Sequence, residues 1–232
     1  MAAIEYDTDR FFEILISGER DAARAVVDGY LQAGSPPEDL LIELYWPTYE
    51  KIEKLFRHDQ LSNLAHHYAT RLLRVLVDQT AAKFVFETSK NRRVIAFCGQ
   101  NEPDELAGQM AVDLLELSGF TIKYAGGGIP RDEILAQVHE ESPDVLLLFG
   151  SSPQDLPEIR LLIDSIREIG AVHDTQIAVG GGVFNRASGL AEEIGADIWA
   201  ADPLELAHVL IEEPDQRATA DQRTVGRKRK AA

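Results

Sequence analysis

The sequence has little of what several kinds of site require. Its single cysteine, Cys98, lies inside an apolar segment, so a disulfide framework is excluded and a small core residue is the simplest interpretation. One cysteine suits a reducing compartment, and we expect a cytoplasmic location. No run of about 18 apolar residues is present, so no membrane span is expected. The first residues, MAAIEYDTDRFFEIL, lack the basic and apolar regions of a secretory signal.

The residues that usually carry hydrolytic or zinc chemistry are also scarce. The histidines form no H-x-x-x-H pair and no cluster with cysteine, so a zinc site is not predicted. They are His58, His66, His67, His139, His173 and His208. Ser151 lies in GSSP and not in the G-x-S-x-G turn of a serine nucleophile. We therefore predict no catalytic residue and no metal-ligating side chain; enzymatic activity is left open, with a non-enzymatic role favoured.

Charge is distributed unevenly along the chain. The formal net charge is −16, yet residues 217–232 carry six basic side chains and one acidic one, which leaves −21 for the rest. An acidic body of this kind repels nucleic acid and anionic membranes. Contact with nucleic acid is therefore expected only through the tail, and no membrane partner is expected. We predict a disordered basic tail over residues 213–232, whose removal from Arg217 onward leaves thermal stability unchanged.

Residues 1–90 show helical patterns throughout and are predicted to form a helical bundle. Glycines stop two helices, and SPPE at Ser35–Glu38 is a capping box that opens a third. Pro47 is expected to break or kink that helix. The last and longest helix follows Ser62. Its apolar residues are predicted to share one buried face; they are Leu61, Leu64, Ala65, Tyr68, Leu72, Val75 and Leu76.

The hydrophobic period changes after the polar segment Glu87–Arg93. Apolar runs of four to six residues, VIAFC, TIKYA, DVLLLF, QIAVG and DIWAA, alternate with helical stretches. Residues 91–212 are thus predicted to form an α/β domain, a Rossmann- or flavodoxin-like five-stranded parallel sheet in the order 2-1-3-4-5. Ligands of such sheets bind at the carboxyl ends of the strands. The loops expected there are GQNEPDELAG, GSSPQDL and GGGVFNRA.

These loops leave several chemical interpretations open. Glu102, Asp104 and Glu105 with Asp155 are candidates for an acid/base pair or a Mg²⁺ site, but simple capping of the helix near Pro103 is favoured. The triplet at residues 126–128 is interpreted as a turn, because it lacks the spacing of a dinucleotide or phosphate loop. For Gly180–Gly182 a turn and the close approach of a flat ligand are equally supported.

The order of bundle and sheet, with these loops, resembles the cobalamin-binding modules of corrinoid proteins. That family includes methionine-synthase-like modules, corrinoid methyl carriers and cobalamin-dependent light-sensing regulators. The similarity extends over about residues 9 to 211. In the bundle it rests on GERDAARAVVDGYLQAGSPPEDLLIELYWPTYEKIEKLF and HDQLSNLAHHYATRLL. In the sheet it rests on IAVGGGVFNRASGLAEEIGADIWAADPLE, where the glycine-rich turn is kept.

The resemblance implies a set of cofactor-binding residues and also a departure from the family pattern. The family carries Asp-x-His-x-x-Gly after its first strand, and the histidine ligates cobalt from below. An ungapped match gives Glu102 for the acid and Asp104 for the histidine, with Ala107 for the glycine. A one-residue slip uses Gly108 and puts Glu105 at the histidine, so that residue is missing in either alignment.

The remaining implied contacts come from both parts of the chain. Phe56 stands where a tryptophan often shields the upper face of the corrin, and His67 stands in the adjacent Glu-His position. Ser151 is the nearest match to a serine after the third strand. Gly180–Gly182, with Ala107, would leave space for the nucleotide tail. Phe56, His67, Asp104, Ser151 and Gly181 are expected to converge on one ligand.

Three hypotheses on function remain. The chain is a cobalamin- or tetrapyrrole-binding sensor or regulatory module that acts through a protein partner, with cobalt not held by a protein histidine. Alternatively it is a corrinoid methyl carrier for a separate methyltransferase, or a cofactor-free interaction scaffold of the same fold. The missing histidine counts against the methyl carrier, because a carboxylate is a hard ligand that replaces imidazole on cobalt poorly. The sequence does not indicate an oligomeric state.

Overall fold

The chain divides into two compact units, Met1–Val85 and Phe86–Ala232, which are treated separately below. The computed structural model describes residues 4–99, 102–170, 172 and 174–219, and residues 102–104 by their backbone alone. The division falls just before the polar segment Glu87–Arg93, at which the hydrophobic period of the sequence changes. Over the described residues, no helix is long and apolar enough to cross a membrane.

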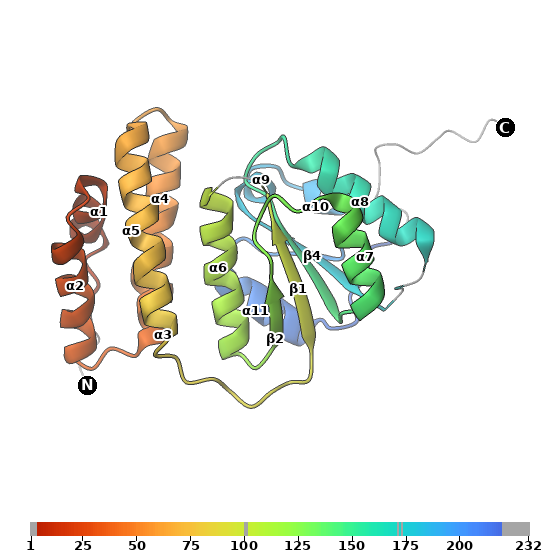
Figure 1. Cartoon of the computed structure of the whole chain (residues 1–232), viewed down its shortest axis with the longest axis horizontal. Helices are drawn as coiled ribbons and strands as arrows, with labels where there is room; N and C mark the ends of the chain where they lie inside the picture. The colour runs from red at the N-terminus through yellow and green to blue at the C-terminus, as the bar shows by residue number, and fades with distance from the viewer. Residues whose placement is uncertain (1–3, 100–101, 171, 173, 220–232) are drawn as a thin grey trace. The chain divides into compact units, whose positions relative to one another are not determined.

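The first unit is helical throughout its described length (Figure 1). Its first turn is capped by Asp7, which accepts a hydrogen bond from the amide of Arg10, and Gly18 ends that helix in the left-handed conformation. Ser62 caps the longest helix by accepting from the amide of Ala65. The elements are α1 (Thr8–Ser17), α2 (Arg20–Gln32), α3 (Pro37–Asp39), the π-helix η1 (Leu40–Tyr45), α4 (Trp46–Arg57) and α5 (Asn63–Ala81).

Pro47 neither breaks nor ends the helix in which it lies. Proline has no amide proton, and its ring collides with the carbonyl four residues earlier in a regular helix. Here the turns before it widen into η1, and the amide of Trp46 donates to the carbonyl of Leu41, five residues back. The chain therefore continues from α3 through η1 into α4, with Pro47 in the first turn of α4. The predicted disturbance is a π-helix.

The buried face of α5 differs from the predicted one. His66, Ala69, Leu73, Val77 and Thr80 are buried, whereas Leu64 and Tyr68 are 61% and 47% exposed. Leu72 and Leu76 are buried as expected. The apolar side chains of α5 occupy more than half of its circumference, so a count of apolar positions alone selected the wrong boundary for the stripe that packs on α1 and α4.

The second unit contains the predicted parallel sheet of five strands in the order β2-β1-β3-β4-β5. This confirms the α/β fold class. The strands are β1 (Arg93–Cys98), β2 (Thr121–Tyr124), β3 (Val145–Phe149), β4 (Gln176–Gly180) and β5 (Ile198–Trp199). The helices are α6 (Glu102–Leu117), α7 (Arg131–Glu141), α8 (Leu156–Ile169), α9 (Gly182–Arg186), α10 (Leu190–Ile194) and α11 (Pro203–Glu212).

Helices cover both faces of the sheet (Figure 1), and each face has its own core. Alternate strand residues such as Phe97, Leu148 and Val179 pack against α7 and α8 on one face. The residues between them, such as Ala96, Leu147 and Ala178, pack against α6 and α11 on the other. Strands covered on both faces read as the continuous apolar runs seen in the sequence.

The predicted tail is not free from its first residue. Gln176, buried at the start of β4, donates to the carbonyls of Glu213 and Gln216, and the amide of Ala218 donates to Asp197 at 2.7 Å. Arg217 donates to the carbonyl of Asp174. Residues 213–218 are therefore held against the sheet unit, which corrects the prediction of disorder from residue 213. Residues 220–232 of that prediction lie outside the described part.

Candidate functional site

The carboxyl ends of β1, β3 and β4 form the edge at which a ligand was predicted. Cys98, Phe149 and Gly180 are paired across these three strands and end them at the same level. All three belong to the face covered by α6 and α11, because side chains alternate along a strand. The side chains of Cys98, Phe149 and Gly180 therefore determine how much space a ligand has at this edge between the sheet and α6.

The ring of Phe149 fills the space beside the predicted glycines. A Cβ built on Gly180 would lie 3.1 Å from that ring, and one built on Gly108 of α6 would lie 3.2 Å from it. The Gly108 position is also 2.5 Å from Sγ of Cys98 and 2.7 Å from the hydroxyl of Tyr124. Phe149 is 5% exposed. The sequence suggested an open slot beside Gly180, and in this structure an aromatic ring occupies that space.

The two glycine-rich turns approach neighbouring backbone so closely that no side chain fits. Gly181 has φ of +104°, and a Cβ there would lie 2.4 Å from the carbonyl oxygen of Gly150. A Cβ on Gly127 would lie 1.9 Å from the carbonyl oxygen of Gly99. Both triplets are therefore turn residues first, and substitution at Gly181 disturbs the fold before it can affect a ligand.

The carboxylates of the loops are engaged in hydrogen bonds with backbone amides. Glu105 accepts from the amide of Gly127 at 3.1 Å, and its carbonyl accepts from the hydroxyl of Tyr124. Asp155 accepts from the amide of Ser152, just before α8. The side chains of Glu102 and Asp104 lie outside the described part. Among the described residues, no group of three or more His, Cys, Asp or Glu side chains could hold a metal ion.

Ser151 contributes mainly through its backbone. Its carbonyl accepts a hydrogen bond from the guanidinium of Arg186 at 2.5 Å, which links the loop after β3 to α9. Asn185, in the same short helix, donates to the carbonyl of Ala201. The loops after β3, β4 and β5 are thus tied together around Gly180 and Gly181.

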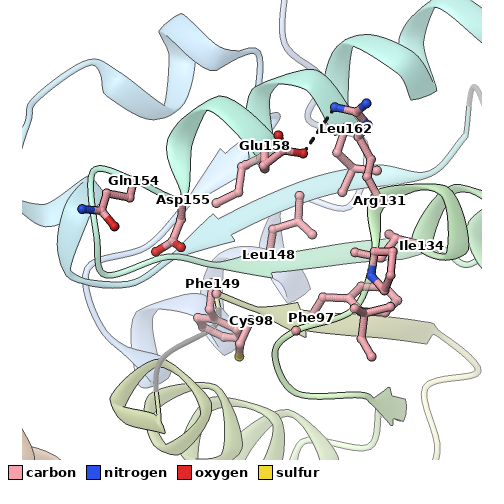
Figure 2. Close-up of a pocket in the computed structure, with 15 residues that line it drawn as sticks. Phe97, Cys98, Arg131, Ile134, Leu148, Phe149, Gln154, Asp155, Glu158 and Leu162 are labelled. Carbon is pink, nitrogen blue, oxygen red and sulfur yellow. Dashed lines mark hydrogen bonds and ion pairs between the residues drawn. The ribbon is translucent and has the colours of Figure 1, made fainter.

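A cavity of about 480 Å³ opens at the same edge on the opposite face of the sheet (Figure 2). We call it the α7–α8 cavity. Its walls include apolar side chains from both strands and both helices: Phe97, Ile134, Leu148, Ile159 and Leu162. The rim is polar, with Gln154, Asp155 and an ion pair of 3.3 Å between Arg131 and Glu158. Apolar walls and a few polar groups at the mouth are typical of small-molecule sites.

In the helical unit, three rings gather at the adjoining ends of α4 and α5. The ring of Phe56 stacks on the imidazole of His66, with 3.9 Å between centroids, and the rings of His66 and His67 lie edge to face at 6.0 Å. Nε2 of His66 lies 2.7 Å from Oε1 of Glu53, and both residues are buried. His67 is exposed and Phe56 is half-buried, so these two can meet a ligand.

The predicted site residues therefore form two groups, one in each unit. Phe56 and His67 are neighbours in the helical unit, and Ser151, Gly180 and Gly181 are neighbours in the sheet unit. Convergence of the two groups on one ligand stays a prediction. Sequence reasoning missed Phe149 and the buried His66, although adjacent histidines on a helix, such as His66 and His67, point to different faces.

The model of one protein family, described as "B12 binding domain", matches residues 8–79. The matched residues make up most of the helical unit, Met1–Val85. The resemblance drawn from the sequence is thereby confirmed for the part of the chain that carries Phe56 and His67. No curated protein matches the sequence significantly.

Solved structures of corrinoid proteins are similar to most of the chain. The monomethylamine corrinoid protein of Methanosarcina barkeri is 17% identical, with a TM-score of 0.69; the alignment covers 88% of this chain and 97% of that one. The methanol:cobalamin methyltransferase complex MtaBC of the same organism gives 14% identity and a TM-score of 0.50 over 94% of this chain and 84% of that one. At these identities the likeness shows the fold alone: a helical unit followed by an α/β unit with a parallel sheet, as in these corrinoid proteins.

Proposed function

We propose that the chain is a corrinoid-binding module that acts as a sensor or regulator through a protein partner and holds its cofactor without a protein histidine on cobalt. The observation that carries the corrinoid is the B12 binding domain match over residues 8–79. The observation that sets the ligation is the loop after β1, whose residues from Glu102 to Gly108 include no histidine. Cobalt would then keep its own dimethylbenzimidazole base or take water.

The residues of the edge support a corrinoid that has no protein histidine on cobalt. A Cβ on Gly108 would collide with the sheet, whereas position 107 already carries the Cβ of an alanine. Gly108 therefore fits the glycine of the family motif better than Ala107 does. That alignment puts Glu105 at the histidine position. Its carboxylate accepts from the amide of Gly127 and is a poor ligand for cobalt. Glu105 would therefore stabilise the loop or accept a hydrogen bond from amides of the cofactor.

The bound group would supply a cobalt centre whose upper ligand can be exchanged or lost, and the protein's part is to hold and shield it. Phe56 would cover part of the upper face with its half-buried ring, and His67 would offer an imidazole there. The glycine turns at Gly127 and Gly181 bring backbone to the edge without side chains in the way. A change of the upper ligand would then alter the contacts of the helical unit with the cofactor, and a protein partner would respond to that change.

A methyl-carrier role is the second candidate, because the monomethylamine corrinoid protein covers 88% of this chain in the structural alignment. The two roles differ in the lower ligand they need. Carriers of this family use the loop histidine to tune cobalt, and this chain has Glu105 there. The experiment below separates them through the spectrum of the bound cofactor.

The test is to incubate the protein with hydroxo-, methyl- and adenosylcobalamin, remove free cofactor by gel filtration, and record the visible spectrum. Retained cobalamin with its benzimidazole still on cobalt is expected. Glu105→His should convert that spectrum to the histidine-ligated, base-off form, with Glu105→Gln as the matched control and Asp104→His testing the ungapped alignment. Retention of no cobalamin by any variant would reject the proposal and leave the interaction scaffold. A base-off spectrum in the unmodified protein would favour the carrier.

A further inference from the structure

The α7–α8 cavity has no role in the site described so far. It lies at the carboxyl edge of the sheet, where the ring of Phe149 fills the space beside the glycines on the opposite, α6 face. A corrinoid that keeps its benzimidazole on cobalt needs room below the ring plane for a rigid, flat, bicyclic base. On the α6 face the ring of Phe149 occupies the space beside two glycines, 3.2 Å from a Cβ built on Gly108 and 3.1 Å from one built on Gly180. On the α7–α8 face, a cavity of about 480 Å³ opens between the ends of β1 and β3.

The position of the cavity is where a parallel sheet of this topology receives ligands. In the order β2-β1-β3-β4-β5 the chain reverses direction across the sheet between β1 and β3. Helices leave the two strands on opposite faces there, which opens a crevice at the carboxyl ends. Cys98, Gly99 and Phe149, the last residues of these strands and the first of the loop, line the cavity mouth.

The walls suit a flat aromatic group. Phe97 and Leu148 come from the strands, and Ile134, Ile159 and Leu162 come from the helices, each at most 8% exposed. Figure 2 shows Leu148, Ile134 and Leu162 around one space, with Arg131 and Glu158 paired at its rim. Volumes of about 300–1,000 Å³ with apolar walls are usual for small-molecule pockets, so one bicyclic base fits with space to spare.

The rim offers a partner for the charged link that joins such a base to the corrin. The base is attached through a ribose and a phosphodiester. Arg131 forms an ion pair with Glu158, and their side chains are 40% and 70% exposed. An exposed ion pair contributes little free energy, so Arg131 can leave Glu158 for another anion at little cost. The Arg131 guanidinium can then donate to phosphate oxygens in two parallel bonds. Asp155 at the mouth offers a carboxylate oxygen to a ribose hydroxyl.

We propose that the α7–α8 cavity binds the lower axial base of a base-on corrinoid, with Arg131 at the phosphodiester and Ile159 in the wall. The inference rests on the proposed function. It adds a subsite formed by the α7 and α8 face of the sheet, and it assigns the α6 face, closed by Phe149, to packing alone.

The test compares two ligands that differ in the nucleotide that carries the base. Hydroxocobalamin carries the nucleotide and base, and cobinamide has the same corrin without them. Ile159→Phe fills the cavity, and Leu161→Phe adds the same ring two residues along α8 at a side chain that is 46% exposed. Affinities are measured by absorbance titration. Ile159→Phe should weaken hydroxocobalamin at least tenfold, about 1.4 kcal/mol, and leave cobinamide and its own melting temperature near those of Leu161→Phe.

A second measurement uses the unmodified protein and does not depend on the folding of a variant. Free 5,6-dimethylbenzimidazole should compete with hydroxocobalamin and leave cobinamide binding unchanged. Equal effects of Ile159→Phe on both ligands, or no competition by the free base, would overturn the cavity assignment while corrinoid binding stands. Failure of both hydroxocobalamin and cobinamide to bind the unmodified protein would overturn the proposed function and this inference together.

Discussion

The imidazole of His66 lies between two partners in the helical unit: its Nε2 is 2.7 Å from Oε1 of Glu53, and its plane stacks on the ring of Phe56 at 19°. Both His66 and Glu53 are buried. The pair therefore fixes Phe56, a predicted ligand contact, from behind. The next residue, His67, is exposed and is not part of this buried pair.

Replacement of His66 by alanine should destabilise the helical unit. It removes the stacked ring and leaves the buried carboxyl group of Glu53 without this hydrogen-bond partner, a loss that costs about 1–3 kcal/mol. Arg57 lies 4.0 Å from the other carboxylate oxygen of Glu53, so we expect the lower end of that range. Urea unfolding measures the change. His67→Ala is the matched control and should stay within about 0.5 kcal/mol; equal losses would contradict the assignment.

Gly108→Ala and Gly29→Ala should have opposite effects on stability, although both glycines lie in helices. Alanine is favoured over glycine in a helix by about 1 kcal/mol. At Gly29 of α2 nothing lies within 4 Å of the new methyl group, so the variant should be more stable by up to that amount. At Gly108 the methyl group meets Cys98 and Tyr124 at under 3 Å, and overpacking of about 1–3 kcal/mol should outweigh the helix preference.

Thermal melts of the two glycine variants give the comparison directly. A Gly108→Ala variant as stable as Gly29→Ala would mean that α6 can move away from the sheet. That result would also reopen the α6 face as a space for the nucleotide of a corrinoid, and so bears on the cavity inference.

The fold could be predicted from the sequence because each strand and helix leaves a local pattern. The change of period at Glu87–Arg93, the apolar runs and the glycines at turns are all set by neighbours in sequence. The plug formed by Phe149 could not be predicted in this way. It depends on which face of the sheet residue 149 occupies and on its pairing with Gly180 across β4, and a run of five buried residues gives no alternation from which to read the face.

The candidate site was predictable only in part for a related reason. The sequence placed Ser151, Gly180 and Gly181 at the carboxyl edge correctly, since parallel strands bring their ends to one side. It took the small residues for empty space. Glycine in a packed structure is as often the position that lets a neighbour approach, and here that neighbour is Phe149. The hydrogen bonds that join Gln176 and Asp197 to residues 213–218 are likewise long-range contacts, and no local sequence pattern predicts them.

Shortening the chain should separate the contacts of residues 214–219 from the rest of the tail. A chain that ends at Thr219 is the reference. A chain that ends at Glu213 also loses the carbonyl of Gln216, the amide of Ala218 and the side chain of Arg217. Asp197 is fully buried and would keep only Arg167 and the amide of Ile177 as donors.

Loss of a hydrogen bond to a buried charged group costs about 1–3 kcal/mol. We therefore expect the shorter chain to be less stable than the reference by about that amount in urea unfolding. Equal stabilities would show that residues 214–219 only rest on the sheet unit, as the sequence analysis supposed for the entire tail.

The last prediction concerns stability at alkaline pH. Tyr45 is fully buried, and its hydroxyl pairs with that of Thr80 at 2.8 Å. Burial raises the pKa of Tyr45 above its ordinary value of 10, because the charged phenolate would lose its hydration. In the unfolded chain this phenol releases its proton from about pH 10, while in the folded chain it stays protonated. Above pH 10 the folded state therefore holds more protons, and stability must fall as pH rises, by about 1.4 kcal/mol per pH unit for one such group.

The free energy of unfolding should be measured between about pH 8 and 11.5, on either side of the pKa of this phenol in the unfolded chain. Tyr45→Phe should be less stable at the low end, because Thr80 loses its partner, and should show a shallower alkaline decline. Tyr68→Phe, at a side chain that is 47% exposed, is the matched control and should keep the slope of the unmodified protein. An unchanged slope in Tyr45→Phe would mean that other groups cause the alkaline loss and that the Tyr45–Thr80 pair opens before the unit unfolds.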